Sequence, residues 1–155
     1  MSQTLFSLSS WLHAVATVIF IGHHLLLTLI YLPVLAKENS GGMILSSISK
    51  RSRIWMYISL VIFMVTGIYL MIADPNYLGF GNFGNLWGIL MLVKHILITG
   101  MIVMGFWYNA ILRVGPLMSS NTGAGMAIVR FGVYSRWMAV SGVLVLLLTA
   151  LAQFE

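Results

Sequence analysis

Residues 6–36 read FSLSSWLHAVATVIFIGHHLLLTLIYLPVLA, a stretch without a single Asp, Glu, Lys or Arg. A helix crosses the apolar core of a membrane with about 20 mostly apolar residues, so this stretch is long enough to span with a tilt or to project beyond the bilayer. The preceding residues lack the positive charge that opens a cleaved signal peptide. The sequence therefore predicts a retained transmembrane helix over residues 6–36.

Three further apolar runs follow, over residues 54–73, 86–112 and 134–154. Asp74-Pro75-Asn76 ends the second run with a turn signal, and glycine-rich segments precede the third and the fourth. Composition agrees, because 60% of the 155 residues are hydrophobic and 7% are charged, whereas soluble domains carry roughly 25% charged residues. We expect one all-α domain over residues 1–155, an integral membrane bundle of four helices embedded in the lipid bilayer.

The positions of the basic residues predict the orientation of this bundle. All but one lie in the first and third connections or at their edges: Lys37, Lys50, Arg51, Arg53, Arg113, Arg130 and Arg136. The second connection contains Asp74 and no base, and the two tails contain no base either. Because connections rich in Lys and Arg stay on the cytoplasmic side, we expect both termini outside. The membrane expected is a plasma membrane of the bacterial inner-membrane type.

Several classes of function are disfavoured by what the chain contains. Its basic residues form no stripe with interleaved aromatic residues, so nucleic acid is not an expected partner. There is no cysteine, which excludes disulfides, thiolate ligands and iron–sulfur clusters. The three acids, Glu38, Asp74 and Glu155, lie near run ends or in connections and form no hydrolytic constellation. Redox chemistry or transport remains, and whether the protein is an enzyme stays open.

The first run carries histidines on a polar stripe. Each helical residue turns the chain by about 100°, which places six residues on one face: His13, Thr17, Phe20, His24, Thr28 and Tyr31. Unpaired polar groups are costly in hydrocarbon, so this face should point into the bundle. His13 and His24 are then about 16 Å apart along the axis. His23 lies among alkyl neighbours and is expected to face another helix or a second subunit.

The third run places two strongly polar residues deep in apolar sequence. His95 shares a stripe with Thr99 and Asn109, and Lys94 lies beside it, about 12 Å along the axis from Leu86. A charged amine at that depth is expensive unless it snorkels or meets an anion. His95 falls about midway in depth between His13 and His24, so either can face it.

Facing histidines in a helical bundle are typical of haem b, since neutral imidazoles supply axial nitrogens from opposite sides. The predicted iron ligands are His95 with His13 or His24, and Lys94 can pair with a haem propionate. These residues predict a membrane electron-transfer protein. The sequence leaves open whether it acts alone, as a homodimer or in a larger respiratory complex.

Two other hypotheses remain. Thioethers and imidazoles suit Cu(I), so Met64, Met101 and Met104 with His24 would form a copper path. Methionine is also a common apolar filler, and intramembrane histidines can simply hydrogen-bond threonine or backbone carbonyls. The protein would then handle copper, or serve as a structural subunit that packs against a larger membrane complex.

Three segments also resemble a known family, the copper-resistance D (CopD-like) membrane proteins. They are WLHAVATVIFIG (residues 11–22), SRIWMYISLVIFMVTGIYL (residues 52–70) and NLWGILMLVKHILITGMIVMGFWYNAILRVGP (residues 85–116). The positions that carry the resemblance are His13, Arg53, Thr66, Gly67, Lys94, Asn109, Arg113 and Pro116. The fourth run is similar only in hydrophobicity, with Arg136 where the pattern has an acid.

The related HemJ-type protoporphyrinogen oxidases are similar in their four-helix plan, with an early histidine and a third-helix lysine. That resemblance implies haem b, whereas the name of the CopD-like family implies copper handling. Only His13 lies at the position that resembles the family's histidine, so the resemblance favours His13 over His24 as the ligand of the first helix. His23, His24 and His95 are outside the pattern, so ligand roles for them follow from the residues alone.

Overall fold

The computed structural model describes residues 3–38, 40–79, 84–110 and 124–153, which form helices and their connecting turns without any strand in these ranges. The predicted helix ends at residues 112 and 154, the side chain of Asn109, and residues Arg113 and Pro116 lie outside this description. Four helical segments are long and apolar enough to cross a membrane: Gln3–Leu35, Gly41–Ala73, Leu86–Trp107 and Ile128–Ala152. The prediction of an all-α chain with four such helices is confirmed.

The first span is one long helix with a widened turn in it. Helix α1 (Gln3–Leu26) continues through a π-helical turn, η1 (Leu27–Tyr31), into the short helix α2 (Leu32–Leu35). Pro33 lies in the first turn of α2 and has no N–H to donate to the preceding turn, which favours a local departure from α geometry. The wider turn shifts the buried face by one residue, so Leu32 is buried while Tyr31, predicted to face inward, is exposed.

Helix α3 (Gly41–Ala73) begins well before residue 54, the predicted start. The prediction followed the apolar run, but the more polar turns before it are held by contacts with the first span. Gly41 approaches Leu35 so closely that a Cβ at this position would collide with the Leu35 carbonyl group. Leu45, one turn later, is fully buried. Tertiary packing therefore extends the helix beyond its apolar segment.

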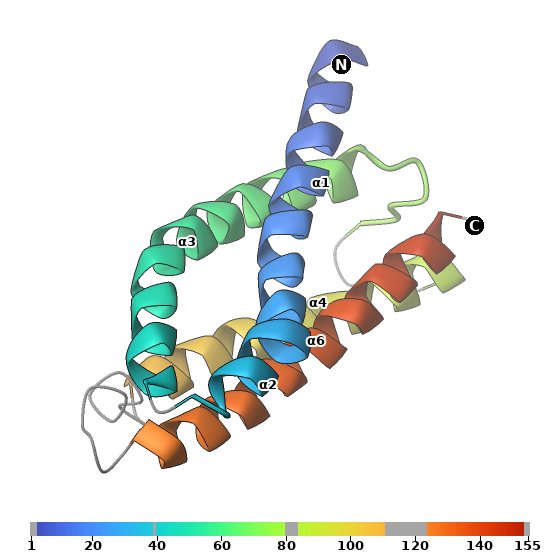
Figure 1. Cartoon of the computed structure of the whole chain (residues 1–155). Coiled ribbons are helices and arrows are strands. Elements are labelled where there is room, and N and C mark those ends of the chain that lie inside the picture. The colour runs from blue at the N-terminus through green and yellow to red at the C-terminus, as the bar shows by residue number, and fades with distance from the viewer. Residues whose placement is uncertain (1–2, 39, 80–83, 111–123, 154–155) are drawn as a thin grey trace.

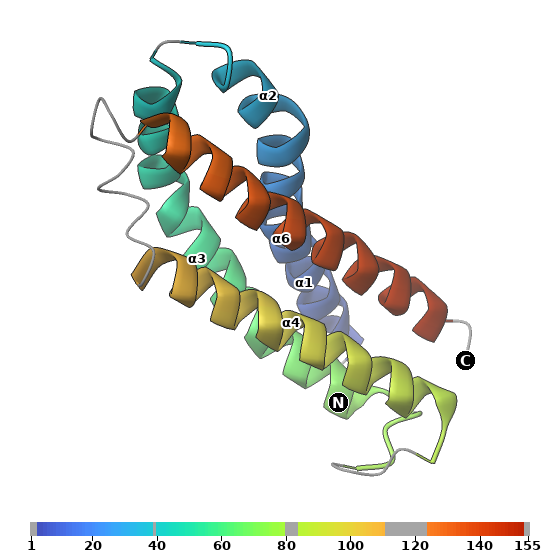
Figure 2. The same ribbon diagram turned by 90° about the horizontal axis from the view of Figure 1, so that it is seen from below.

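Helix α4 (Leu86–Ala110) and helix α6 (Ala124–Ala152) complete the bundle. The fourth predicted helix, residues 134–154, is likewise too short at its start, because α6 already begins at Ala124. Helix α1 packs mainly against α3, and α4 packs mainly against α6. In Figures 1 and 2 the partners within each pair run in opposite directions, and α2 lies at the same end as the starts of α3 and α6.

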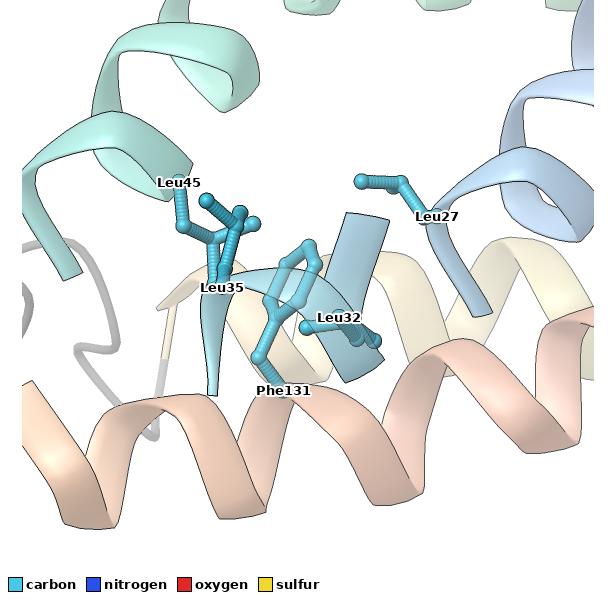
Figure 3. Close-up of a cluster of buried hydrophobic side chains, with 5 residues drawn as sticks. All are labelled: Leu27, Leu32, Leu35, Leu45 and Phe131. Carbon is cyan, nitrogen blue, oxygen red and sulfur yellow. The ribbon is translucent and has the colours of Figure 1, made fainter. Parts of the chain in front are cut away.

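Two clusters of buried apolar side chains hold the helices together. One lies near α2 and contains Leu27, Leu32, Leu35, Leu45 and Phe131, drawn in Figure 3. The other contains Ala16, Phe63, Ile98 and Val145, one residue from each long helix. Many large apolar side chains remain exposed, such as Val18 at 71% and Leu29 at 70%, as expected of surfaces that face lipid.

Candidate functional site

A cavity of about 120 Å³ lies among the four long helices. Leu27 and Phe131 of the cluster near α2 form part of its wall, and Phe20, Met101 and Ile102 form another part. Because α1, α3, α4 and α6 all contribute side chains, the space exists only in the assembled bundle. The polar groups along its wall decide what it can bind.

His24 is the most buried of these polar groups, with 4% of its surface exposed. Its Nδ1 lies 2.9 Å from the carbonyl oxygen of Phe20, one turn earlier in α1. A carbonyl can only accept, so Nδ1 carries the proton and Nε2 keeps a free lone pair. Metal-ligating histidines usually have this arrangement, in which the second ring nitrogen donates to a carbonyl or carboxylate and fixes the ring. His24 is therefore oriented as a ligand would be.

His23 lines the same cavity. Its ring centroid is 5.6 Å from that of His24, in an edge-on arrangement. It was expected to face another helix or a second subunit, and in this structure its ring borders the space among the helices. A long side chain covers surface to one side of its own Cα, so angular spacing alone did not reveal that both rings border one space.

Three thioethers surround the same space, from Met56 of α3, Met101 of α4 and Met138 of α6. Met101 and Met138 are 4% and 2% exposed. Of the four residues predicted for a copper path, only Met101 and His24 come together here, because Met64 and Met104 are exposed and do not line the cavity. Met64 and Met104 are therefore separated from the other two residues of the predicted copper path, which itself stays a prediction.

The end of the cavity toward the start of α3 is polar. Ser49, Ser52 and Arg53 line it, and the Ser52 hydroxyl donates a long hydrogen bond of 3.4 Å to the Ser49 carbonyl oxygen. The segment from Arg53 to Ala73 alone spans about 30 Å, the thickness of the hydrocarbon core. Arg53 thus precedes a segment long enough to cross a membrane, and the apolar part of the cavity is lined by later residues of α3, such as Leu60.

His13 lies elsewhere, in the contact between α1 and α3. The Thr66 hydroxyl donates to the Ile62 carbonyl oxygen at 2.6 Å, so Thr66 must accept from His13 Nδ1, which is 2.9 Å away. The ring stacks on Phe63 with centroids 4.6 Å apart. A Cβ at residue 67, which is Gly67, would be only 3.1 Å from His13 Cε1. His13 is thus held on several sides.

His95 and Lys94 are partly buried on α4 and do not line the cavity. His95 Nδ1 lies 2.6 Å from the Met91 carbonyl oxygen, the same local arrangement as in His24. Lys94 is within electrostatic range of His13. Of the predicted site residues, His24 and Met101 therefore line the cavity, whereas His13, His95, Lys94, Met64 and Met104 do not. Within the described residues, no three His, Cys, Asp or Glu side chains form a metal-binding group.

Arg53, Met56 and Leu60 are cavity residues that the sequence reading did not assign to a site. Their spacing, together with Ser49, follows i, i+4, i+7 and i+11, which is one face of a helix. That pattern was present in the sequence, but the other side of α3 is equally apolar, so the sequence did not show which side faces the cavity. Nothing in the spacing revealed that this face would lie opposite His24.

Comparison of the chain with protein-family models, with curated proteins and with solved structures finds no match. What the cavity binds therefore has to be inferred from its own residues.

Proposed function

We propose that this protein is a membrane-embedded electron carrier that binds haem b in the cavity among its four helices, with Nε2 of His24 as an axial ligand. The observation that carries the proposal is the state of His24. It is buried, its Nδ1 is fixed on the Phe20 carbonyl oxygen, and it borders a space lined by all four helices. Bound haem supplies a one-electron couple inside the bilayer.

The other side chains of the cavity suit this cofactor. Met101 and Met138 present thioethers, and His with Met is a known axial pair for haem iron. Phe20 and Leu60 offer apolar surface for a macrocycle, and the bundle excludes water from the iron. In this proposal, neither His13 nor His95 binds the iron in the cavity, and Lys94 does not pair with a haem propionate.

A macrocycle needs more room than the cavity provides. Sites for drug-sized ligands hold about 300–1,000 Å³, against about 120 Å³ here. Because α1 packs mainly on α3 and α4 mainly on α6, the cavity can widen if the two pairs move apart as units. In this proposal, haem uptake widens the cavity by moving α1 away from α6.

A second function is favoured by one specific observation. Met56, Met101 and Met138 border the cavity together with His24, and thioethers with imidazole suit Cu(I). A single ion fits the present space without separation of the helices. Copper binding is thus the alternative, with Met56 and Met138 in the places that Met64 and Met104 were expected to fill.

The setting is proposed from the charges. Lys50, Arg51 and Arg53 lie toward the start of α3, and Arg130 and Arg136 lie toward the start of α6, at the same end of the bundle. We place this end in the cytoplasm and both termini outside, in a plasma membrane. The electron partner would be met there, within a homodimer or a larger respiratory complex.

The test is spectroscopic and uses the full chain purified in detergent. The dithionite-reduced protein should show Soret and α bands, and haem per protein should fall to background in His24→Ala while His13→Ala retains it. Metal analysis of the same samples checks for copper. Loss in His13→Ala with retention in His24→Ala moves the haem to the contact between α1 and α3. Copper without haem selects the alternative, and neither cofactor leaves a structural subunit.

A further inference from the structure

Arg53 is an exposed charged side chain at the polar end of the cavity, where it meets no acidic lining residue. None of the described residues that line the cavity is acidic. Asp74 lies at the opposite end of α3, about 30 Å away by helical rise, and accepts a hydrogen bond from the Asn76 backbone N–H. Glu38 is exposed in the turn before α3. A guanidinium in this position is suited to an anion that arrives with a ligand.

The surroundings of Arg53 define the form of that ligand. Ser49, one turn before Arg53, and Ser52, directly before it, also line the cavity and add hydroxyl groups. Deeper in the cavity the wall becomes apolar, with Phe20, Leu60 and Met101. In the proposed membrane setting Arg53 lies near the boundary, since about 30 Å of helix follows it before Ala73. The matching ligand has an apolar body and a negative group at one edge.

We infer that Arg53, assisted by the hydroxyl groups of Ser49 and Ser52, binds the propionate carboxylates of the macrocycle and so orients it with its acidic edge toward the α2 end of the bundle. This inference rests on the proposed function and assigns to Arg53 the role first expected of Lys94. Arg53 is a positioning residue, and the fork of its guanidinium matches a carboxylate with two parallel hydrogen bonds.

The closing experiment separates the carboxylates from the iron. Metal-free protoporphyrin IX and its dimethyl ester share one ring, but only the first carries the two carboxylates. Binding of each to the purified full chain is followed by porphyrin fluorescence for wild type, Arg53→Gln, Arg53→Lys and Arg51→Gln. Arg51 is the matched control, because it is an equally basic neighbour on α3 that does not line the cavity.

For the diacid, Arg53→Gln should weaken binding about 10- to 100-fold, the usual effect of losing a charged hydrogen-bond partner. Arg53→Lys should lose less, and Arg51→Gln should bind as wild type does. The dimethyl ester should bind all four proteins alike. Equal loss for diacid and ester, or an equal effect of Arg51→Gln, overturns the inference.

Two further outcomes distinguish a failure of this inference from a failure of the proposed haem ligation by His24. Competition by phosphatidic acid, without any difference between diacid and ester, assigns Arg53 to a lipid phosphate and also overturns the inference. The metal-free ring needs no axial ligand, so its binding does not depend on ligation by His24. If haem is retained in His24→Ala while the ester difference persists, ligation by His24 fails and the carboxylate site stands.

Discussion

His13 and His24 lie on the same side of one helix, about 20° apart around its axis, yet their surroundings differ. His13 gives its Nδ1 proton to Thr66 and is packed between Phe63 and the backbone at Gly67. His24 is turned toward its own helix at Nδ1 and borders an open space. A polar stripe on a helix thus indicates which side chains face inward. Whether a ligand has room beside them depends on the residues of the other helices.

The strongest test of this comparison locks the cavity while leaving the surroundings of His13 alone. A Cβ at residue 142 would lie 3.5 Å from Ile21 Cβ, within the range of about 3.5–4.5 Å that disulfides bridge. The double variant Ile21→Cys with Gly142→Cys should therefore cross-link α1 to α6 on oxidation. Because the proposed haem uptake separates these helices, the oxidised protein should take up none, and reduction should restore uptake.

Wild type treated with the same oxidant is the control, since the chain has no cysteine of its own. Haem per protein and the mobility of the cross-linked band are measured on the same sample. Full uptake by the cross-linked protein would contradict the idea that the helices must separate. Copper uptake, if that is the function, should continue in the oxidised form.

A smaller effect is expected where His13 is packed. Thr66→Val keeps the shape of the side chain but removes the acceptor of the His13 Nδ1 proton. The free energy of unfolding in detergent micelles should fall by about 0.5–2 kcal/mol, the range for hydrogen bonds within membrane bundles. Haem content should stay that of wild type, because the change is remote from the cavity. A spectrum altered as much as in His24→Ala would mean that the two regions form one site.

The smallest expected effect is a difference in stability between two glycine-to-alanine variants. Replacing a glycine by alanine within a helix stabilises it by up to about 1 kcal/mol. Gly22→Ala should gain this stability, because a Cβ there has no atom of another residue within 4 Å. Gly67→Ala should gain little or nothing, because its Cβ would press on His13 Cε1 at 3.1 Å. Thermal unfolding of the two variants gives the difference directly, and equal stabilisation would show that His13 can move aside freely.

Much of the fold was predictable because the bilayer imposes simple rules. Four apolar runs gave the four spans, and Asp74 with Pro75 gave the end of α3. The early start of α3 was missed because Leu45 packs on the first span, a tertiary contact that hydropathy does not reveal. The pairing of α1 with α3 was not predictable either, since helices surrounded by lipid are apolar on both faces and carry little directional signal.

The candidate site was predicted in part. The polar stripe on the first run predicted that His24 faces inward, and His24 is buried in the structure. Whether His95 ligates iron stays a prediction. From the sequence, Arg53 was assigned only to the prediction of membrane orientation and to the family resemblance, because a basic residue at the end of a span usually marks the membrane boundary. Its place in the cavity depends on how α3 faces α1, which requires three-dimensional packing.

The π-helical turn at Leu27–Tyr31 changes the phase of the first span. Before the turn, the buried residues His24 and Leu27 are three positions apart. After the turn, Leu32 and Leu35 are again three positions apart, whereas Leu27 and Leu32 are five positions apart across the turn. If the same residues were wound as a regular α-helix, one half of the span would be rotated by about 100° against the other. Either His24 would then leave the cavity or Leu32 and Leu35 would leave the cluster at α2. The turn thus lets one long helix present His24 in its first half and Leu32 and Leu35 in its second half to the same side of the bundle.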